Sequence, residues 1–155
     1  MKIKSILFPT DFSECNKAAL EYASWFAVQS GATLHLVYVH DPREVGAVIG
    51  EGSYLFAEKW EEERARAQTQ LKQVTAADST IPCEHHFLLG IPDAEIVAYA
   101  IDHHIDLIVM ASHGRSGLSR LLMGSVAESV MRKAPCPVLV VKQPDATISP
   151  ASAAS

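Results

Sequence analysis

Glycines and hydroxyl side chains gather after an apolar run near the C-terminal third of the chain. The run continues as Ala111-Ser112-His113-Gly114-Arg115 and is followed by Met123-Gly124-Ser125. Glycine lets backbone amides approach a phosphate closely, and a helix that begins at such a place adds unpaired N–H groups and the positive end of its dipole. Ser125 could donate its hydroxyl to a phosphate oxygen or bind a metal ion held by it. The pattern indicates a phosphate-binding loop, with a flexible loop before a Ser-capped helix as the alternative.

This loop is not a Walker A motif, because the triplet Gly-Lys-Ser/Thr occurs nowhere and the lysine that reaches the outer phosphates is missing. Arg115 and Arg120 could supply positive charge, or they remain solvated. Asp11, expected at the end of the first strand, could contact a ribose hydroxyl or a base amine, or form an Asx turn into the next helix. No serine has a Gly-x-Ser-x-Gly setting. Binding without efficient turnover is therefore favoured over enzymatic activity.

The histidines show no metal-ligand spacing such as His-x3-His. In each of the adjacent pairs His85-His86 and His103-His104, one side chain is expected to face inward and the other outward. His113 lies in the glycine-bearing loop, where it is expected to brace the loop by hydrogen bonding. The sequence therefore predicts no metal site.

Composition points to an ordinary globular protein with an acidic balance. The chain has 155 residues, 48% of them apolar, and a net charge of −5, which argues against nucleic acid or an anionic membrane as the main partner. The apolar run Ile6–Phe8 is too short for a signal peptide, and no run of about 18 apolar residues exists. Cys15, Cys83 and Cys136 are odd in number, widely separated and without Cys-x2-Cys spacing, so we expect them to be reduced thiols. These features predict a cytoplasmic protein without membrane insertion.

The elements that must position the loop alternate between strands and helices. Strands are expected at residues 3–8, 33–39, 83–89, 106–110 and 138–141, with helices between them. This alternation predicts a doubly wound parallel α/β sheet covered by helices on both faces. Ligands of such sheets bind beyond the carboxyl ends of the strands, here the loops after the first and fourth strands. One domain is expected over residues 1–142, followed by a disordered tail at 143–155.

Helical periodicity predicts which side chains face the core. Ser13 is the expected N-cap of the first helix, and a long second helix is expected at about 53–76. The inward faces of the first, third and fourth helices are predicted to be Cys15, Ala19, Tyr22 and Phe26; Ile96, Val97, Ala100 and Ile101; and Val126, Ala127, Val130 and Met131.

Three separated motifs resemble the universal stress protein family. Ala111-x2-Gly114, nine residues and then Gly124-Ser125 is similar to that family's ATP-binding signature, G-x2-G-x9-G-[ST]. The opening run Phe8–Ser13 and the closing run Pro135–Val141 are also typical of it. The resemblance covers about residues 2–142. One position departs from the signature, since Ala111 stands where the first glycine is expected.

The resemblance implies a five-stranded sheet of order 3-2-1-4-5, like that of the adenine nucleotide alpha hydrolases, and a bound adenine nucleotide. It places Asp11 near the adenosine, the Val39 backbone at the adenine ring, and Gly124 with its neighbours at the phosphates. ATP, ADP and AMP are equally compatible, and Mg²⁺ would accompany ATP. The residues expected around the nucleotide are Pro9, Thr10, Asp11, Val39, Met110, Ala111, His113, Gly114, Arg115, Gly124, Ser125 and Val126.

The resemblance also implies a homodimer that pairs through the last strand, Val138–Val141. The favoured function is a regulatory or stress-response module whose binding of a protein partner depends on the nucleotide. Two alternatives stay open, a slow ATPase or phosphotransferase and a dimeric scaffold without nucleotide. Of these, the scaffold is favoured only by Ala111.

Overall fold

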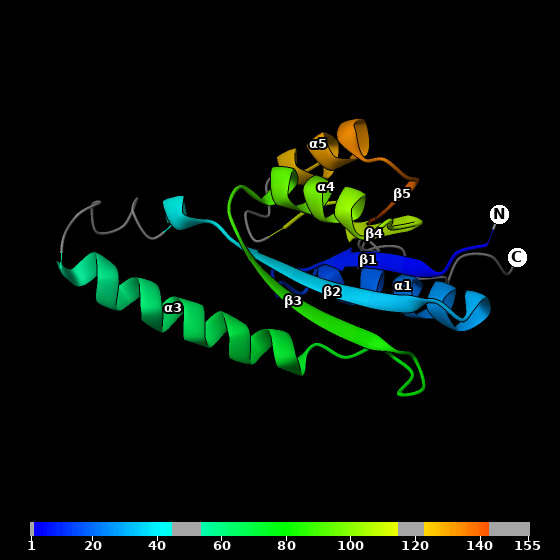
Figure 1. Ribbon diagram of the computed structural model, residues 1–155, viewed down its shortest axis with the longest axis horizontal. Coiled ribbons are helices and arrows are strands. Elements are labelled where there is room, and N and C mark those ends of the chain that lie inside the picture. The colour runs from blue at the N-terminus through cyan, green and yellow to red at the C-terminus, as the bar shows by residue number, and fades with distance from the viewer. Residues whose placement is uncertain (1, 45–53, 115–122, 143–155) are drawn as a thin grey trace, which may run out of the picture.

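The structure, a computed structural model, describes residues 2–44, 54–114 and 123–142, and its centre is a five-stranded parallel sheet (Figure 1). The strand order is β3-β2-β1-β4-β5, which confirms the predicted topology. The strands are β1 (Ser5–Pro9), β2 (Thr33–His40), β3 (Cys83–Leu89), β4 (Leu107–Ala111) and β5 (Val138–Val141).

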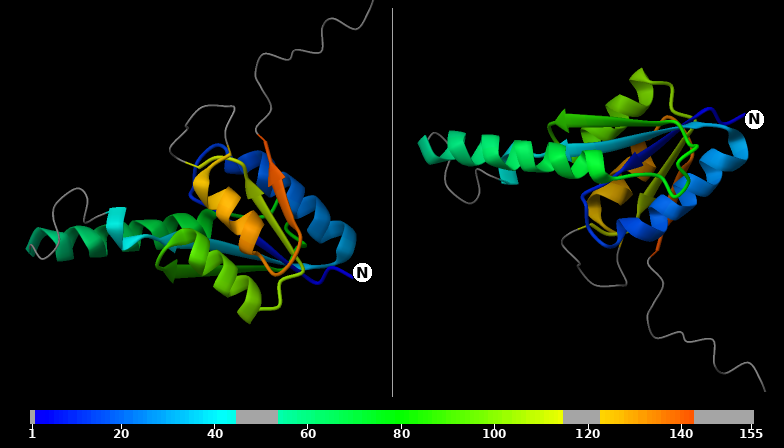
Figure 2. Two further views of the ribbon diagram at one scale, coloured as in Figure 1. Left: turned by 90° about the horizontal axis from the view of Figure 1, so that it is seen from above. Right: turned by 90° about the horizontal axis from the view of Figure 1, so that it is seen from below.

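Helices cover both faces of the sheet, as expected when strands are joined by right-handed crossovers. One face carries α1 (Asn16–Ser30) and α3 (Tyr54–Gln73), and the other carries α4 (Pro92–Asp102) and α5 (Ser125–Lys133). In Figure 2 the two pairs lie on opposite sides of the strands. The N-terminal part of α3 projects beyond the sheet in all these views (Figures 1 and 2).

Two apolar layers form because successive strand residues point to opposite faces. Ile6 and Phe8 of β1 pack with the α1 side, whereas Leu7 between them packs with the α4 and α5 side. All three side chains are fully buried. The central strands therefore read as continuous apolar runs and hold the strand ends in fixed positions.

The start and the buried face of α1 differ from the prediction. The helix begins at Asn16 with Cys15 as its N-cap, and Ser13 instead accepts the Asn16 N–H through its carbonyl in a preceding turn. Ala19 and Ala23 are buried, whereas Tyr22 is 53% exposed. Small alanines let the helix axis come close to β4, so the aromatic ring turns outward.

The inner faces of α4 and α5 were predicted in part. Ile96 and Ala100 are buried as expected, and so are Ala127 and Val130 of α5. Val97 and Val126 are half-buried, whereas Ile101 and Met131 are exposed. Each helix thus buries a narrower stripe than the apolar pattern suggested, because only one side of it meets the sheet.

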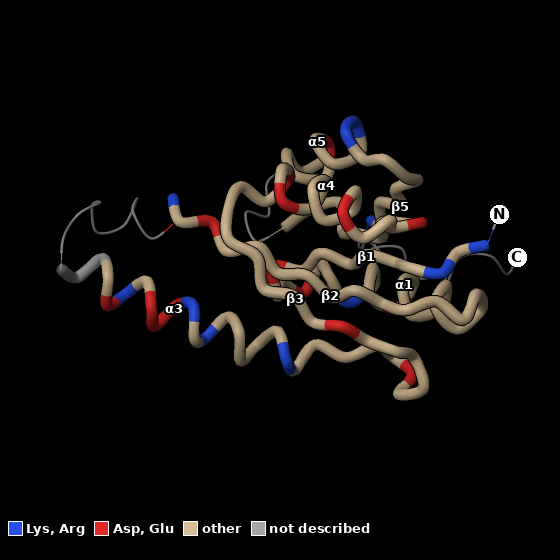
Figure 3. The backbone as a smooth tube through the Cα atoms, viewed as in Figure 1, with Lys and Arg blue, Asp and Glu red and all other residues tan. Residues whose placement is uncertain are grey.

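Figure 3 marks the charged residues along the backbone: α3 carries many of both signs, whereas β1, β2 and β4 carry none. Lys59 of α3 forms ion pairs with Glu62 and Glu63 at 3.4 and 3.2 Å. Residues three and four positions apart lie on neighbouring turns of a helix, so such pairs are common on exposed helices. Within the described ranges no helix combines the length and apolarity needed to cross a bilayer. The prediction for the tail at 143–155 falls outside the described residues.

Asp93 connects the first turn of α4 to α5. Its Oδ2 accepts hydrogen bonds from Ser129 Oγ at 2.6 Å and Lys133 Nζ at 3.2 Å. The Ser129 hydroxyl, and then Lys133, hold the pKa of Asp93 below its usual value. This contact fixes two helices that both contribute to the cavity described below.

Replacing Asp93 by Asn should lower the free energy of unfolding at pH 7 by about 1 kcal/mol, because the Ser129 contact loses its charged acceptor. The folded pKa is the lower one, so this stabilisation is present above the unfolded value of about 3.9 and is lost as the pH falls through the folded pKa. Urea unfolding of both proteins from pH 7 to pH 3 measures the difference. Asp102→Asn at the exposed far end of α4 is the control, and an equal loss there would contradict the assignment.

Candidate functional site

A cavity of about 300 Å³ lies at the carboxyl ends of β1, β2 and β4, where α5 begins. This is the edge at which doubly wound sheets bind their ligands. All of the sequence-predicted site residues within the described ranges line this one cavity, and Arg115 falls outside those ranges. The predicted residues at the cavity are Pro9, Thr10, Asp11, Val39, Met110, Ala111, His113, Gly114, Gly124, Ser125 and Val126.

The N-terminus of α5 presents backbone donors to the cavity. Gly124 is the N-cap in an extended conformation, and its carbonyl accepts the Glu128 N–H at 3.0 Å as the first turn closes. The amides of Ser125, Val126 and Ala127 precede that bond, so they have no carbonyl to pair with inside the helix. All three residues line the cavity. This end of the helix is therefore suited to an anionic group.

The two loop glycines are needed for space. Neither has a positive φ, but a Cβ on Gly114 would lie 2.6 Å from Asp11 Oδ2, and one on Gly124 would lie 3.2 Å from the Ser112 carbonyl oxygen. Any side chain at these positions would press on the first loop or on the loop backbone. Glycine thus lets the two loops approach each other beside the cavity.

Ala111 does not disturb this arrangement. It is the last residue of β4, and it is not among the described residues with a positive φ, which apart from glycines are Phe12 and His104. An extended strand residue does not require glycine. The departure from the signature is therefore mild in conformational terms, which removes the one argument that favoured a scaffold without nucleotide.

The loop after β1 is held by its own side chains. Asp11 Oδ1 accepts the Ser13 N–H at 3.0 Å, which is the Asx turn considered from the sequence, and it also accepts a hydrogen bond from Asn16 Nδ2. Thr10 Oγ1 accepts the Phe12 N–H at 3.0 Å, and the Thr10 N–H donates to the Val37 carbonyl. Asp11 thus fixes the loop and lines the cavity at the same time.

Ser112 and His113 brace the opposite loop. Ser112 Oγ and His113 Nδ1 lie 2.9 Å apart, the Ser112 N–H donates to the Val141 carbonyl, and the Ser112 carbonyl accepts the Gly124 N–H. These contacts tie the loop to β5 and to the start of α5. They agree with the expected bracing role of His113.

Sequence reasoning missed several residues of the cavity. Ile96 and Pro92 of α4 form an apolar wall opposite the strand ends, and Asn16 and Glu44 add polar groups. No short motif marks them, because they belong to helices and turns that only the tertiary fold brings to the strand ends. For Ile96, the sequence indicated only that its side chain faces inward on the helix that follows β3.

The comparisons with known proteins agree with this geometry. The model of the universal stress protein family matches residues 2–142. The universal stress protein MJ0531 of Methanocaldococcus jannaschii is 39% identical over 142 residues, with 91% of this chain and 83% of the relative covered. MJ0577 of the same organism is 34% identical, with 90% of this chain and 95% of that protein covered.

Solved structures give the same result. The structure of MJ0577 superposes with a TM-score of 0.81 at 33% identity and covers 94% of this chain and 99% of that chain. A universal stress protein in complex with cAMP superposes with a TM-score of 0.59 at 25% identity, covering 92% and 98%. On the matched sequence, the sheet order and these relatives, the protein belongs to the universal stress protein family.

Proposed function

We propose that this protein binds an adenine nucleotide, with ATP as the expected ligand, in the cavity between the loops after β1 and β4 and the start of α5. The observation that carries the proposal is the convergence of the predicted residues on this one cavity. A relative of the same family has been solved with cAMP, an adenine nucleotide.

The two ends of the cavity differ in chemistry in the way a nucleotide requires. Val39, Met110 and Ile96 line the cavity and offer apolar contacts suited to a flat base, and we assign the ring edge to the Val39 backbone on the family resemblance. At the other end the amides of residues 125–127 and the hydroxyl of Ser125 meet the phosphates. Asp11 also lines the cavity, and we assign its carboxylate the role of accepting a hydrogen bond from a ribose hydroxyl.

Mg²⁺ would accompany the phosphates of bound ATP, and the Ser125 hydroxyl in the described lining of the cavity is suited to bind it. The ion supplies neutralisation of the phosphate charge. The described residues of the cavity would bind and orient the ligand, and we assign the Ser112–His113 contact there to bracing of the loop and not to catalysis. Nucleotide binding that alters a partner-binding surface, in a regulatory or stress-response role, is the function that follows.

The proposal predicts that purified protein carries an adenine nucleotide and is stabilised by ATP. Mass spectrometry of small molecules released on denaturation should identify the nucleotide. ATP at about 100 times its Kd should add about 2.7 kcal/mol to the free energy of unfolding, which raises the Tm by on the order of 5 °C. GTP at equal concentration is the control for the base. Absence of both a released nucleotide and an ATP-dependent Tm shift would overturn the proposal.

We also propose that two copies pair through β5. The carbonyls of Pro137, just before β5, and of Val141, its last residue, accept the N–H groups of Ile108 and Ser112 on the β4 side. Alternate residues of a strand face the same neighbour, so Val138 and Val140 present their backbone groups to the outer edge. An apolar edge strand of this kind is normally paired or covered. A homodimer with the two β5 strands side by side would pair these outer backbone groups.

A further inference from the structure

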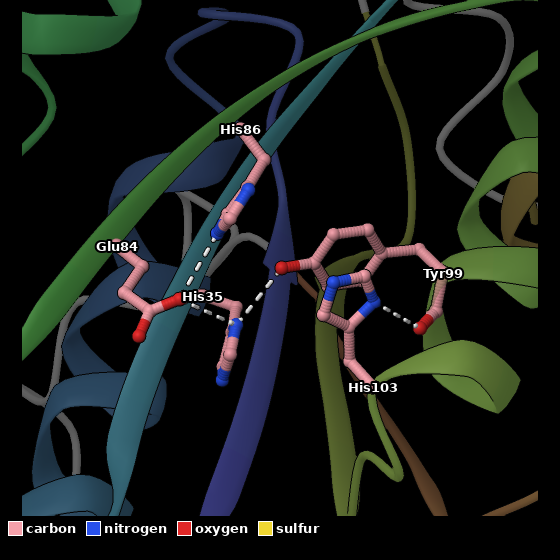
Figure 4. A network of polar contacts seen from close by, with 5 residues as sticks. All are labelled: His35, Glu84, His86, Tyr99 and His103. Atoms are coloured by element: carbon pink, nitrogen blue, oxygen red, sulfur yellow. Dashed lines mark hydrogen bonds and ion pairs between the residues drawn. The ribbon is translucent and has the colours of Figure 1, made fainter.

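Three ligand-type side chains meet on the face of the sheet that α4 covers, away from the nucleotide cavity. The parallel register of β2 and β3 places His35 directly opposite Glu84, and His86 follows two residues later on the same face of β3. Figure 4 shows the two imidazoles and the carboxylate turned toward one another beside Tyr99 and His103 of the α4 segment. Among the described residues this is the group of histidine, cysteine and acidic side chains close enough to share a metal ion.

The distances fit a small divalent ion. Glu84 Oε2 lies 3.1 Å from His86 Nε2 and 3.6 Å from His35 Nδ1, and the three ligand atoms all lie within 4.8 Å of one another. A tetrahedral zinc ion with bonds of 2.0–2.2 Å holds its ligand atoms about 3.3 Å apart. A modest closure of the two rings would therefore suffice.

Burial and hydrogen bonding suit this chemistry. The His35 side chain is 9% exposed, and burial lowers the pKa of His35, although the Glu84 charge acts in the opposite direction. His35 Nδ1 lies 2.9 Å from the Tyr99 hydroxyl and 3.6 Å from Glu84 Oε2. A metal ion held there would bind Nδ1 in place of the hydrogen bond with Tyr99.

The cluster is also accessible. The side chains of His86 and Glu84 are 31% and 53% exposed, so exposure rises from His35 outward. An ion could meet the carboxylate first and then reach the buried ring. His103 stacks on Tyr99 with ring centroids 3.8 Å apart and donates its Nδ1–H to the Tyr99 carbonyl, which fixes the α4 side of the cluster.

We propose that His35, Glu84 and His86 form a binding site for a divalent transition metal ion of the zinc class. Two imidazoles and one carboxylate are ligands that Zn²⁺ prefers over Mg²⁺, and three protein ligands leave a further position for water. None of the three residues lines the nucleotide cavity. The proposed metal site can therefore be tested separately from the proposed nucleotide site.

The test is a Zn²⁺ titration of chelator-treated protein kept reduced and free of nucleotide. Competition against a chromophoric zinc chelator should give one ion per chain with a Kd of about 1 µM or lower. In a two-dimensional spectrum of the histidine ring nitrogens, His35 and His86 should shift on addition of Zn²⁺. Mg²⁺ at millimolar concentration should leave both signals in place.

Variants assign the ligands. His86→Ala and Glu84→Gln should each weaken Zn²⁺ binding on the order of 100-fold while the Tm shift with ATP is unchanged. Both positions are partly exposed, so these variants are expected to fold. His85→Ala is the matched control, because His85 lies between them in sequence but turns to the opposite side of β3 and contacts the Val74 carbonyl. It should bind Zn²⁺ as tightly as the unmodified protein.

Two results would overturn the proposal. One is a Kd above about 100 µM for the unmodified protein, which would show a hydrogen-bonded cluster without metal affinity. The other is binding that survives both His86→Ala and Glu84→Gln but is lost on blocking the cysteine thiols, which would place the ion elsewhere.

Discussion

Replacing Gly124 by Asp should abolish measurable ATP binding, with a loss of affinity of at least 100-fold. The new carboxylate would sit at the N-cap of α5, beside the amides proposed to hold the phosphates. Two like charges about 4 Å apart repel by several kcal/mol in a partly buried site, and each 1.4 kcal/mol is tenfold in affinity. The added Cβ would also press on the Ser112 carbonyl, 3.2 Å away. Calorimetric titration with ATP measures the change.

The same substitution should leave the fold intact, which makes the result informative. Gly124 has φ −62° and ψ 148°, a conformation open to any residue, and Asp is a favoured N-cap. The favourable N-cap and the tight 3.2 Å contact with the Ser112 carbonyl act in opposite directions, so the Tm without nucleotide should change by only a few degrees. Met131→Asp adds the same charge to the exposed side of the same helix and should retain ATP affinity within a few-fold. Tight ATP binding by Gly124→Asp would show that the phosphates do not bind at the N-terminus of α5.

If two copies pair through β5 as proposed, replacing Val140 by Lys should convert that dimer into a monomer. Val140 presents its backbone to the outer edge of the sheet, and pairing of two β5 strands across a two-fold axis would bring the two added ammonium groups into one interface. Lysine on an edge strand opposes pairing, and an unpaired charge in an interface costs several kcal/mol. The dimer dissociation constant should rise at least 100-fold. Analytical ultracentrifugation at micromolar concentration distinguishes the two states.

The opposite edge of the sheet provides the control for this experiment. Leu89 of β3 is 47% exposed on the other outer strand, so Leu89→Lys adds the same charge far from β5 in the strand order. It should leave the oligomeric state unchanged. A Val140→Lys protein with native circular dichroism that sediments as a dimer would refute pairing through β5.

The positions of the strands were predictable because each strand is an apolar run between clear turn residues, whereas their order came from the family resemblance. The bounds of β3 and β5 agree with the prediction. The buried helix faces were harder to predict. Hydrophobicity ranks Tyr22 above Ala23, but close packing of a helix on a sheet favours the small residue, and only the interhelical and helix–sheet distances decide which one is buried.

The candidate nucleotide site was predictable where its residues are contiguous. The loop that contains Gly114 and the start of α5 can be read from the chain, whereas Val39 contributes backbone and was named only through the family resemblance. The histidine cluster was missed because its ligands were sought within one segment. His35 and Glu84 become neighbours only through the register of β2 on β3, which no local spacing encodes.

Helix α4 contacts both ligand positions within one turn. Ile96 forms part of the cavity wall, and Tyr99, three residues later, reaches His35. A small rotation or slide of this helix would change the shape of both places together. If either occupant shifts the helix, thermodynamic linkage requires that nucleotide and metal alter each other's affinity by the same factor. One helix would then couple the proposed metal site to the proposed nucleotide cavity.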